Sequence, residues 1–79
     1  MQNWKEYIVS DPKILLGKPT IKGSRLSVEF IISLFAQGWT EDMVLKNYDL
    51  KKEELAAVFA YVQDLIKDGL MFESPLKAA

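Results

Sequence analysis

The chain of 79 residues contains no cysteine and no histidine. It can therefore form no disulfide, and it offers neither a thiolate nucleophile nor the imidazole that usually serves as a general base or transition-metal ligand. A domain of this size buries only about 60% of the surface that its unfolded chain exposes, so it is often stabilised by disulfides, a metal or a partner. The composition thus predicts a protein that associates with another chain and needs no metal or cofactor.

Catalytic groups are scarce in the rest of the sequence as well. The serines have no histidine to activate them, and no lysine dyad is evident. Two carboxylate pairs, Glu41-Asp42 and Glu53-Glu54, each stand at an expected helix start, where the positive end of the helix dipole explains them. We therefore expect a binding protein with no catalytic residues, not an enzyme.

Long hydrophobic runs are also missing. The N-terminus lacks the apolar segment of a signal peptide. No apolar run approaches the roughly 18 residues that cross a membrane. We expect a cytoplasmic protein that does not enter a membrane.

Charge is unevenly distributed along the chain, although the net charge is only −1. The first 25 residues hold five cations and two anions, a net +3, whereas the remainder holds five cations and nine anions, a net −4. This asymmetry suggests two faces with different partners, and the alternative is an unevenly charged, solvated surface.

Short β-prone segments separated by turns make up residues 1–26. Tyr7–Val9, Ile14–Leu16 and Thr20–Lys22 are each bounded by proline or glycine, which predicts two or three very short strands. Pro12 and Pro19 confine these strands to sheet edges.

Helical spacing begins at Ser27, a suitable N-cap residue. The first helix is predicted to bury Val28, Ile31, Ile32 and Phe35 and to end at Gly38, and it is the central helix of the bundle.

A second short helix is predicted to follow Thr40 as its N-cap, with Met43, Val44 and Tyr48 on its buried face. The third helix is predicted from Lys52 to Asp68 and to end at Gly69. Its predicted core face consists of Leu55, Val58, Phe59, Val62 and Ile66.

These elements predict one mainly α domain: short strands and turns over residues 1–26, a three-helix core over 27–69 and a C-terminal arm over 70–79. Three helices with links of about three residues are typical of a helix-turn-helix module.

Five cations are the candidate nucleic-acid contacts. Lys18, Lys22 and Arg25 lie close together in the turn-rich segment, and Lys51 and Lys52 begin the third helix, so all could approach phosphates.

The outward face of that helix is expected to carry few base-reading groups. Besides Gln63 and Asp64, it offers the alanines Ala56, Ala57 and Ala60, whereas a groove-reading helix presents Arg, Lys, Asn or Gln. We expect any DNA binding to be weak per monomer and to require a dimer.

Small residues on the third helix predict a contact with a partner chain. Ala56 and Ala60 form one stripe, and Ala57 and Tyr61 form another; such spacing allows a second helix to approach, with Tyr61 as an anchor. The alternative is that the strand region covers this face.

The C-terminal arm carries the consecutive apolar residues Leu70, Met71 and Phe72, with Leu76 beyond them. A hydrophobic contact at the helix end explains Leu70 but not its two neighbours, so we expect the arm to dock on a partner chain.

The segment Gly17-Lys18-Pro19-Thr20-Ile21-Lys22-Gly23-Ser24-Arg25-Leu26-Ser27-Val28 resembles the hallmark of the bacterial domain of unknown function 433 family, G-K-P-x-I-x-G-T-R-hydrophobic-P-V. Further similarity lies in Asp11-Pro12, Gly38–Glu41, Tyr48–Leu50 and Ala56–Tyr61. The resemblance implies a homeodomain-like three-helix core and a role as an antitoxin of VapB type whose partner is a PIN-like ribonuclease toxin.

Three positions depart from the family pattern. Ser24 replaces Thr, Ser27 replaces a frequent Pro, and Lys51 replaces the Thr or Ser that caps the third helix. The last change removes a capping acceptor at a cost of about 1 kcal/mol, unless Asp49 substitutes.

The resulting expectation is a dimeric antitoxin-like regulator that binds a PIN-like nuclease and its own promoter DNA. Arg25 and Lys22 would pair with the carboxylates of the toxin's active site. Alternatively, Arg25 holds its turn through backbone carbonyls, and the protein is a homodimeric interaction module with no DNA role.

Overall fold

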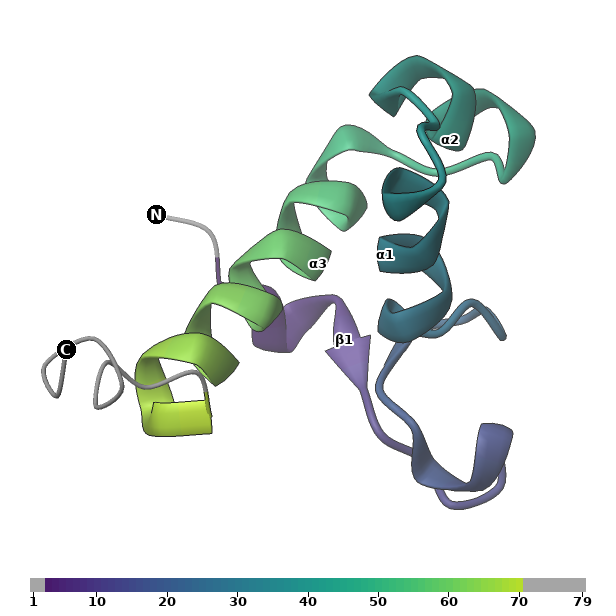
Figure 1. Cartoon of the computed structure of the whole chain (residues 1–79). Helices are drawn as coiled ribbons and strands as arrows, with labels where there is room; N and C mark the ends of the chain where they lie inside the picture. Colours follow the sequence, from purple (N-terminus) through teal and green to yellow (C-terminus); the bar gives the residue numbers. More distant parts are fainter. Residues whose placement is uncertain (1–2, 71–79) are drawn as a thin grey trace, which may run out of the picture.

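The computed structural model describes residues 3–70, and within them the chain forms three α-helices and one two-stranded sheet (Figure 1). The mainly α fold with N-terminal strands is therefore as predicted. No helix within this range is long and apolar enough to cross a membrane.

The N-terminal region combines strands with single helical turns. A 3₁₀ turn, η1 (Trp4–Glu6), precedes β1 (Ile8–Val9), and a second 3₁₀ turn, η2 (Leu15–Gly17), precedes β2 (Thr20–Ile21). The strands pair antiparallel, with Ile8 opposite Ile21 and both side chains buried.

Two of the two or three predicted strands are present, and the third candidate segment, Ile14–Leu16, forms no strand. The Ile14 N–H donates to the Asp11 carbonyl and the Gly17 N–H to the Ile14 carbonyl, so successive turns use the donors that a sheet would need. Leu16 has a left-handed φ of 58° and is 95% exposed.

The first helix, α1 (Val28–Ala36), begins and ends as predicted. The Ser27 hydroxyl accepts a hydrogen bond from the Phe30 N–H at 2.9 Å. At the other end Gly38 has a φ of 99°, and the Trp39 N–H donates to the Leu34 carbonyl at 3.0 Å, which is the closure of a Schellman motif.

Replacing Gly38 with alanine is expected to lower the free energy of unfolding by about 1–2 kcal/mol, because an L-residue is strained at positive φ. A Cβ here would meet no atom within 4 Å, so the backbone alone causes the loss. Urea denaturation measures it, and the exposed neighbour Gln37→Ala should change stability by less than about 0.5 kcal/mol. Equal losses in both variants would contradict this explanation.

The second helix, α2 (Glu41–Asn47), is capped by the Thr40 hydroxyl, which accepts from the Met43 N–H at 3.2 Å. Val44 is fully buried, but Met43 is 42% exposed, so its predicted place on the buried face is wrong. Asp49 follows the C-terminus of α2 with a left-handed φ of 54°, and the chain then turns toward the third helix.

The third helix, α3 (Lys52–Leu65), continues into a π-helical turn, η3 (Ile66–Leu70), instead of remaining α-helical to Asp68 as predicted. Lys51 has no acceptor to offer at the N-cap, but its own N–H donates to the Glu54 carboxylate at 2.9 Å. Half of a capping box thereby replaces the missing cap.

The buried face of α3 differs from the predicted one. Leu55 and Val58 are buried as expected, and Ala57 is buried with them, whereas Phe59 is 42% and Ile66 43% exposed. The expectation that Ala57 faces outward, and that Phe59 and Ile66 face the core, is therefore wrong.

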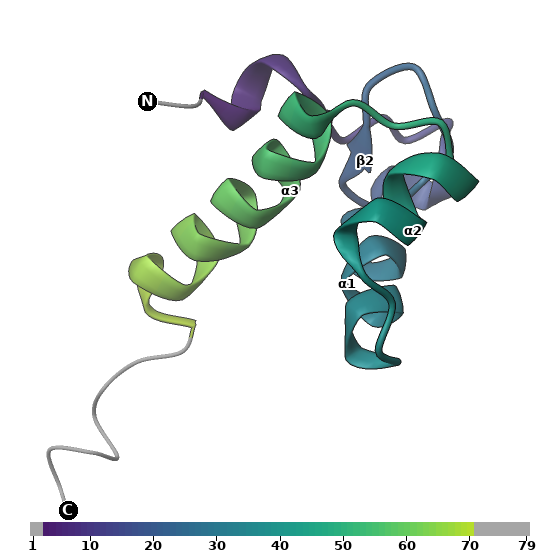
Figure 2. The ribbon, with the colours of Figure 1, turned by 90° about the horizontal axis from the view of Figure 1, so that it is seen from above.

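One hydrophobic cluster joins these elements: Ile8, Ile21, Val28, Ile31, Leu34, Val44, Leu55, Ala57 and Val58. Only the N-terminal half of α3 contributes to it. The backbone of α3 lies closer to η1 and β1 than to α1, and the two helices diverge toward the C-terminal end of α3 (Figure 2).

Candidate binding surfaces

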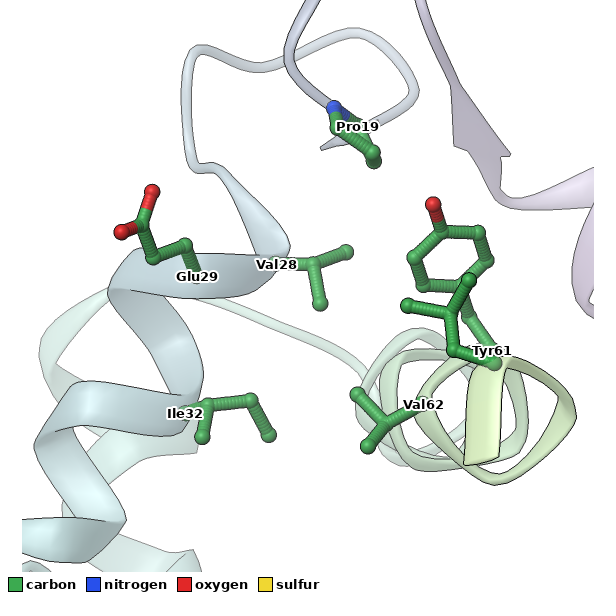
Figure 3. Close-up of a pocket in the computed structure, with 7 residues that line it drawn as sticks. Pro19, Val28, Glu29, Ile32, Tyr61 and Val62 are labelled. Atoms are coloured by element: carbon green, nitrogen blue, oxygen red, sulfur yellow. The ribbon is translucent and has the colours of Figure 1, made fainter. Parts of the chain in front are cut away.

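An apolar groove opens where α1 and α3 diverge. Its volume is about 420 Å³, and Figure 3 shows Val28 and Ile32 of α1 facing Tyr61 and Val62 of α3 across it. Leu65 and Pro19 complete the apolar lining. Val28, predicted as core, is buried in the hydrophobic cluster, and Ile32 and Val62, also predicted as core, are half-buried against it. All three also line the groove, because the helices separate here.

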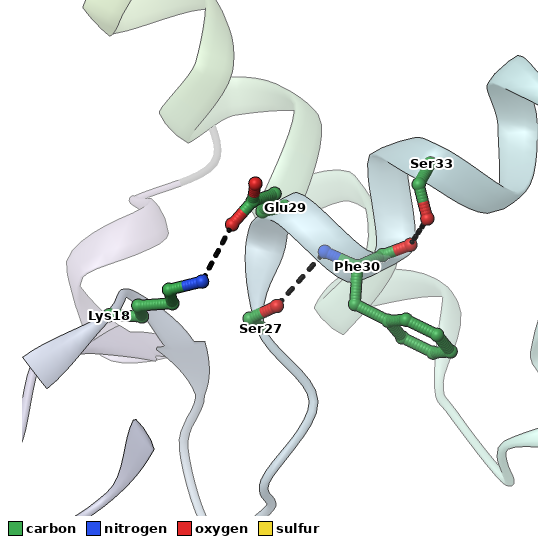
Figure 4. A network of polar contacts seen from close by, with 5 residues as sticks. All are labelled: Lys18, Ser27, Glu29, Phe30 and Ser33. Carbon is green, nitrogen blue, oxygen red and sulfur yellow. Dashed lines mark hydrogen bonds and ion pairs between the residues drawn. The ribbon is translucent and has the colours of Figure 1, made fainter. Parts of the chain in front are cut away.

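A salt bridge lies at the rim of the groove. The Lys18 ammonium is 3.1 Å from the Glu29 carboxylate, and both side chains are more than half exposed (Figure 4). An exposed pair of this kind contributes little stability. It nevertheless gives the Lys18 ammonium a partner within the chain.

The turn between β2 and α1 presents two cations. The Ser24 hydroxyl donates to the Ile21 carbonyl at 2.8 Å and accepts from the Leu26 N–H at 3.0 Å. Lys22 and Arg25 are exposed, and within the described part of the chain their side chains make no hydrogen bond or ion pair. The turn is held by Ser24, so the structural role considered for Arg25 is not needed here.

The basic residues do not form one continuous face. Lys22 and Arg25 precede the N-terminus of α1, whereas Lys51 and Lys52 begin α3 near the C-terminal end of α1 (Figure 1). A nine-residue helix rises about 14 Å and separates the two groups. A ligand that contacts both groups must therefore span the length of α1.

The N-terminal turn η1 packs against the C-terminal half of α3. The Trp4 indole N–H donates to the Asp64 carboxylate at 2.6 Å, and its ring packs edge-on against Tyr61 with centroids 4.7 Å apart. Tyr61, predicted as a partner contact, thus already has a neighbour within the chain. The role of Trp4 was missed because nothing near it in the sequence points to α3.

The outer side of α3 carries exposed apolar residues. Ala56 is exposed, Ala60 is half-buried, and the Phe59 ring packs edge-on against Phe35 with centroids 5.2 Å apart. A smaller pocket of about 230 Å³ lies beside this pair, with Ala56 and Lys52 in its lining. Of the predicted arm, Met71, Phe72 and the side chain of Leu70 lie outside the described residues.

Comparison with known proteins places most of the chain in one family. The family model described as "Protein of unknown function (DUF433)" matches residues 8–62, a range that includes the basic turn, all three helices to Val62 and both walls of the groove. Searches of curated proteins and of solved structures gave no match.

Proposed function

The chain belongs to the DUF433 family of proteins of unknown function, and we propose that it acts as an antitoxin-like regulator that binds and neutralises a PIN-like nuclease. The observation that supports this most is the basic turn, in which Lys22 and Arg25 are exposed while the Ser24 hydroxyl and backbone hydrogen bonds hold the chain. The two cations are available to a partner at no cost to the fold.

The chemistry of the proposed partner suits such a turn. A PIN-like active site is a cluster of carboxylates that holds a divalent cation. A guanidinium can pair with a carboxylate through two parallel hydrogen bonds, so insertion of Arg25 would compete with metal and with RNA for the same oxygens. The apolar groove beside α1 offers an adjoining surface for the body of the nuclease.

We expect Arg25→Ala to weaken binding to the nuclease at least tenfold, because the partner's carboxylates would lose their paired charge. The measurement is co-purification and titration with the product of the adjacent open reading frame. Lys46→Ala removes an exposed cation from α2 and is the matched control. A neighbouring product that is harmless when expressed alone, or equal binding by both variants, would refute the proposal.

Promoter binding forms a separate part of this proposal and would use the helix-turn-helix of α2 and α3. Lys51 and Lys52 are exposed at the start of α3 and can contact phosphates. The same helix face continues with Ala56, Phe59 and Gln63, so little base reading is expected.

Binding to the protein's own upstream DNA, measured over a salt series with and without the nuclease, tests this part. Each phosphate-contacting lysine should contribute about 1 to the slope of log affinity against log salt. Lys52→Ala should reduce that slope by about 1. No detectable shift under either condition would leave only a protein-binding role.

The second candidate function is a homodimeric interaction module without a DNA role. The exposed apolar side of α3, with Phe59 at 42% and Ile66 at 43% exposure, favours it. It predicts self-association without any DNA shift, whereas the regulator predicts both.

A further inference from the structure

The turn η2 carries a leucine that the fold does not use. The Leu16 side chain is 95% exposed, so it contributes almost no buried apolar surface. Its φ of 58° lies in the left-handed region, and so does the φ of 51° of Leu15 before it. Leucine is strained there, and two such residues in succession are unusual. The chain thus holds an apolar side chain in solvent in a conformation that costs stability.

Main-chain hydrogen bonds hold this turn in place. The Gly17 N–H donates to the Ile14 carbonyl at 3.0 Å, and the Lys18 N–H donates to the Leu15 carbonyl at 3.1 Å. These bonds need no side chain at position 16. A strained residue that the fold does not require suggests a role in binding. Because the turn is already ordered, Leu16 would lose little backbone entropy when it enters a partner.

The surroundings of Leu16 are basic. A pocket of about 390 Å³ is lined by Leu15, Leu16, Lys18 and Ser27. Ser27 stands two residues after Arg25, and η2 and the basic turn lie at the same end of the molecule, where α1 begins (Figure 1). Residues 11–25 hold four cations and one anion. The exposed leucine is therefore part of a surface with a net positive charge.

We infer that Leu16 is an apolar contact of the same partner as the basic turn, and that it enters a recess beside the carboxylates that pair with Arg25. This inference rests on the nuclease binding proposed above and adds a second contact to that surface. Charge complementarity favours this occupant, because a carboxylate-rich partner matches the positive surface around Leu16.

Two other occupants fit the charges less well. A second copy docked through this same surface would bring the cations of both chains together, and like charges oppose such an isologous contact. An anionic membrane would receive only Leu16 and part of Leu15, which is 40% exposed. So small an apolar surface anchors a protein weakly to lipid.

Substitution of Leu16 by glycine in the full-length chain tests the inference. We expect Leu16→Gly to weaken binding to the purified product of the adjacent open reading frame at least tenfold, because an apolar contact is lost. The same variant should unfold at a higher urea concentration than wild type, because glycine adopts a left-handed φ without strain. Damage to the fold would instead lower binding and stability together.

Two control variants separate the side chain from the backbone. Leu16→Met keeps an apolar side chain of similar volume and should bind within about threefold of wild type. Asp49→Gly is the matched backbone control, because Asp49 is exposed and has a left-handed φ of 54° in the turn after α2. It removes a left-handed side chain from another turn and should leave binding to the nuclease unchanged.

A salt series distinguishes the apolar contact from the charged one. The loss caused by Arg25→Ala should shrink as the salt concentration rises, because salt screens exposed charges. The loss caused by Leu16→Gly should stay the same, because burial of apolar surface is not screened. A Leu16→Gly effect that disappears at high salt would contradict an apolar contact.

The outcomes separate this inference from the function on which it rests. A wild type that does not bind the nuclease would refute both. If Arg25→Ala weakens binding and Leu16→Gly does not, only the contact through Leu16 is refuted. A Leu16→Gly chain that is less stable than wild type would show that the fold uses Leu16 after all. Binding of the wild type to phosphatidylserine vesicles that depends on Leu16, without binding to the nuclease, would make a membrane the occupant and overturn the inference.

Discussion

Replacing Ile31 with alanine is expected to lower the free energy of unfolding by about 3–4 kcal/mol. Ile31 lies in the middle of α1 and is fully buried in the cluster that joins the sheet to all three helices. Removing its side chain loses the transfer energy of the deleted carbons and leaves a cavity that a close-packed interior cannot fill. Because small domains are stable by only about 5–15 kcal/mol, this variant should unfold at a much lower urea concentration.

Ile66→Ala provides a control that deletes the same atoms from the surface. Ile66 is 43% exposed, so its replacement should cost less than about 1 kcal/mol at protein concentrations where the chain is monomeric. Urea denaturation followed by circular dichroism measures both variants. Equal losses would mean that the core does not lie where α1 meets β2 and the start of α3.

The helix ends could be predicted because their signals are local. Ser27 and Thr40 each place a hydroxyl within reach of a backbone N–H three residues later. Gly38 supplies a backbone conformation that other residues adopt only with strain. None of these interactions depends on the rest of the fold, so residue type and spacing were sufficient to predict them.

The inward face of α3 could not be predicted, because the eight residues from Leu55 to Val62 are all hydrophobic. A helical period identifies a buried face only when polar residues mark the opposite side. Here the tertiary contacts decide: Ala57 is small enough to be buried close to its neighbours, and Phe59 is left at the surface against Phe35. The prediction reversed these two residues.

Of the two candidate surfaces, one could be predicted from the sequence and the other could not. The basic turn was identified because Lys22, Gly23 and Arg25 lie within four consecutive residues. The groove was missed, since its walls come from α1 and α3 and exist only because α3 packs on η1 and β1 and diverges from α1. No local pattern specifies the angle between two helices that are distant in sequence.

Trp4 joins η1 to the C-terminal half of α3, and Trp4→Ala is expected to lower the free energy of unfolding by about 2–3 kcal/mol. The indole donates to Asp64 at 2.6 Å and packs edge-on against Tyr61. The substitution removes a hydrogen bond to a carboxylate, an aromatic pair and much apolar contact. Trp4 is only half-buried, which keeps the expected loss below that of a fully buried tryptophan.

A double-mutant cycle separates the hydrogen bond from the packing. Trp4→Phe should cost about 1 kcal/mol, because it keeps a ring against Tyr61 and removes only the donor. In a background that carries Asp64→Ala, the same change should cost much less, and the difference is the coupling energy of the pair. No coupling would mean that packing alone holds η1 on α3.

If the contact with Trp4 fixes the direction of α3, Trp4→Ala should also speed amide hydrogen exchange in the turn after Tyr61. The turn after Lys52 should be affected less, because only the turn after Tyr61 loses a neighbouring side chain.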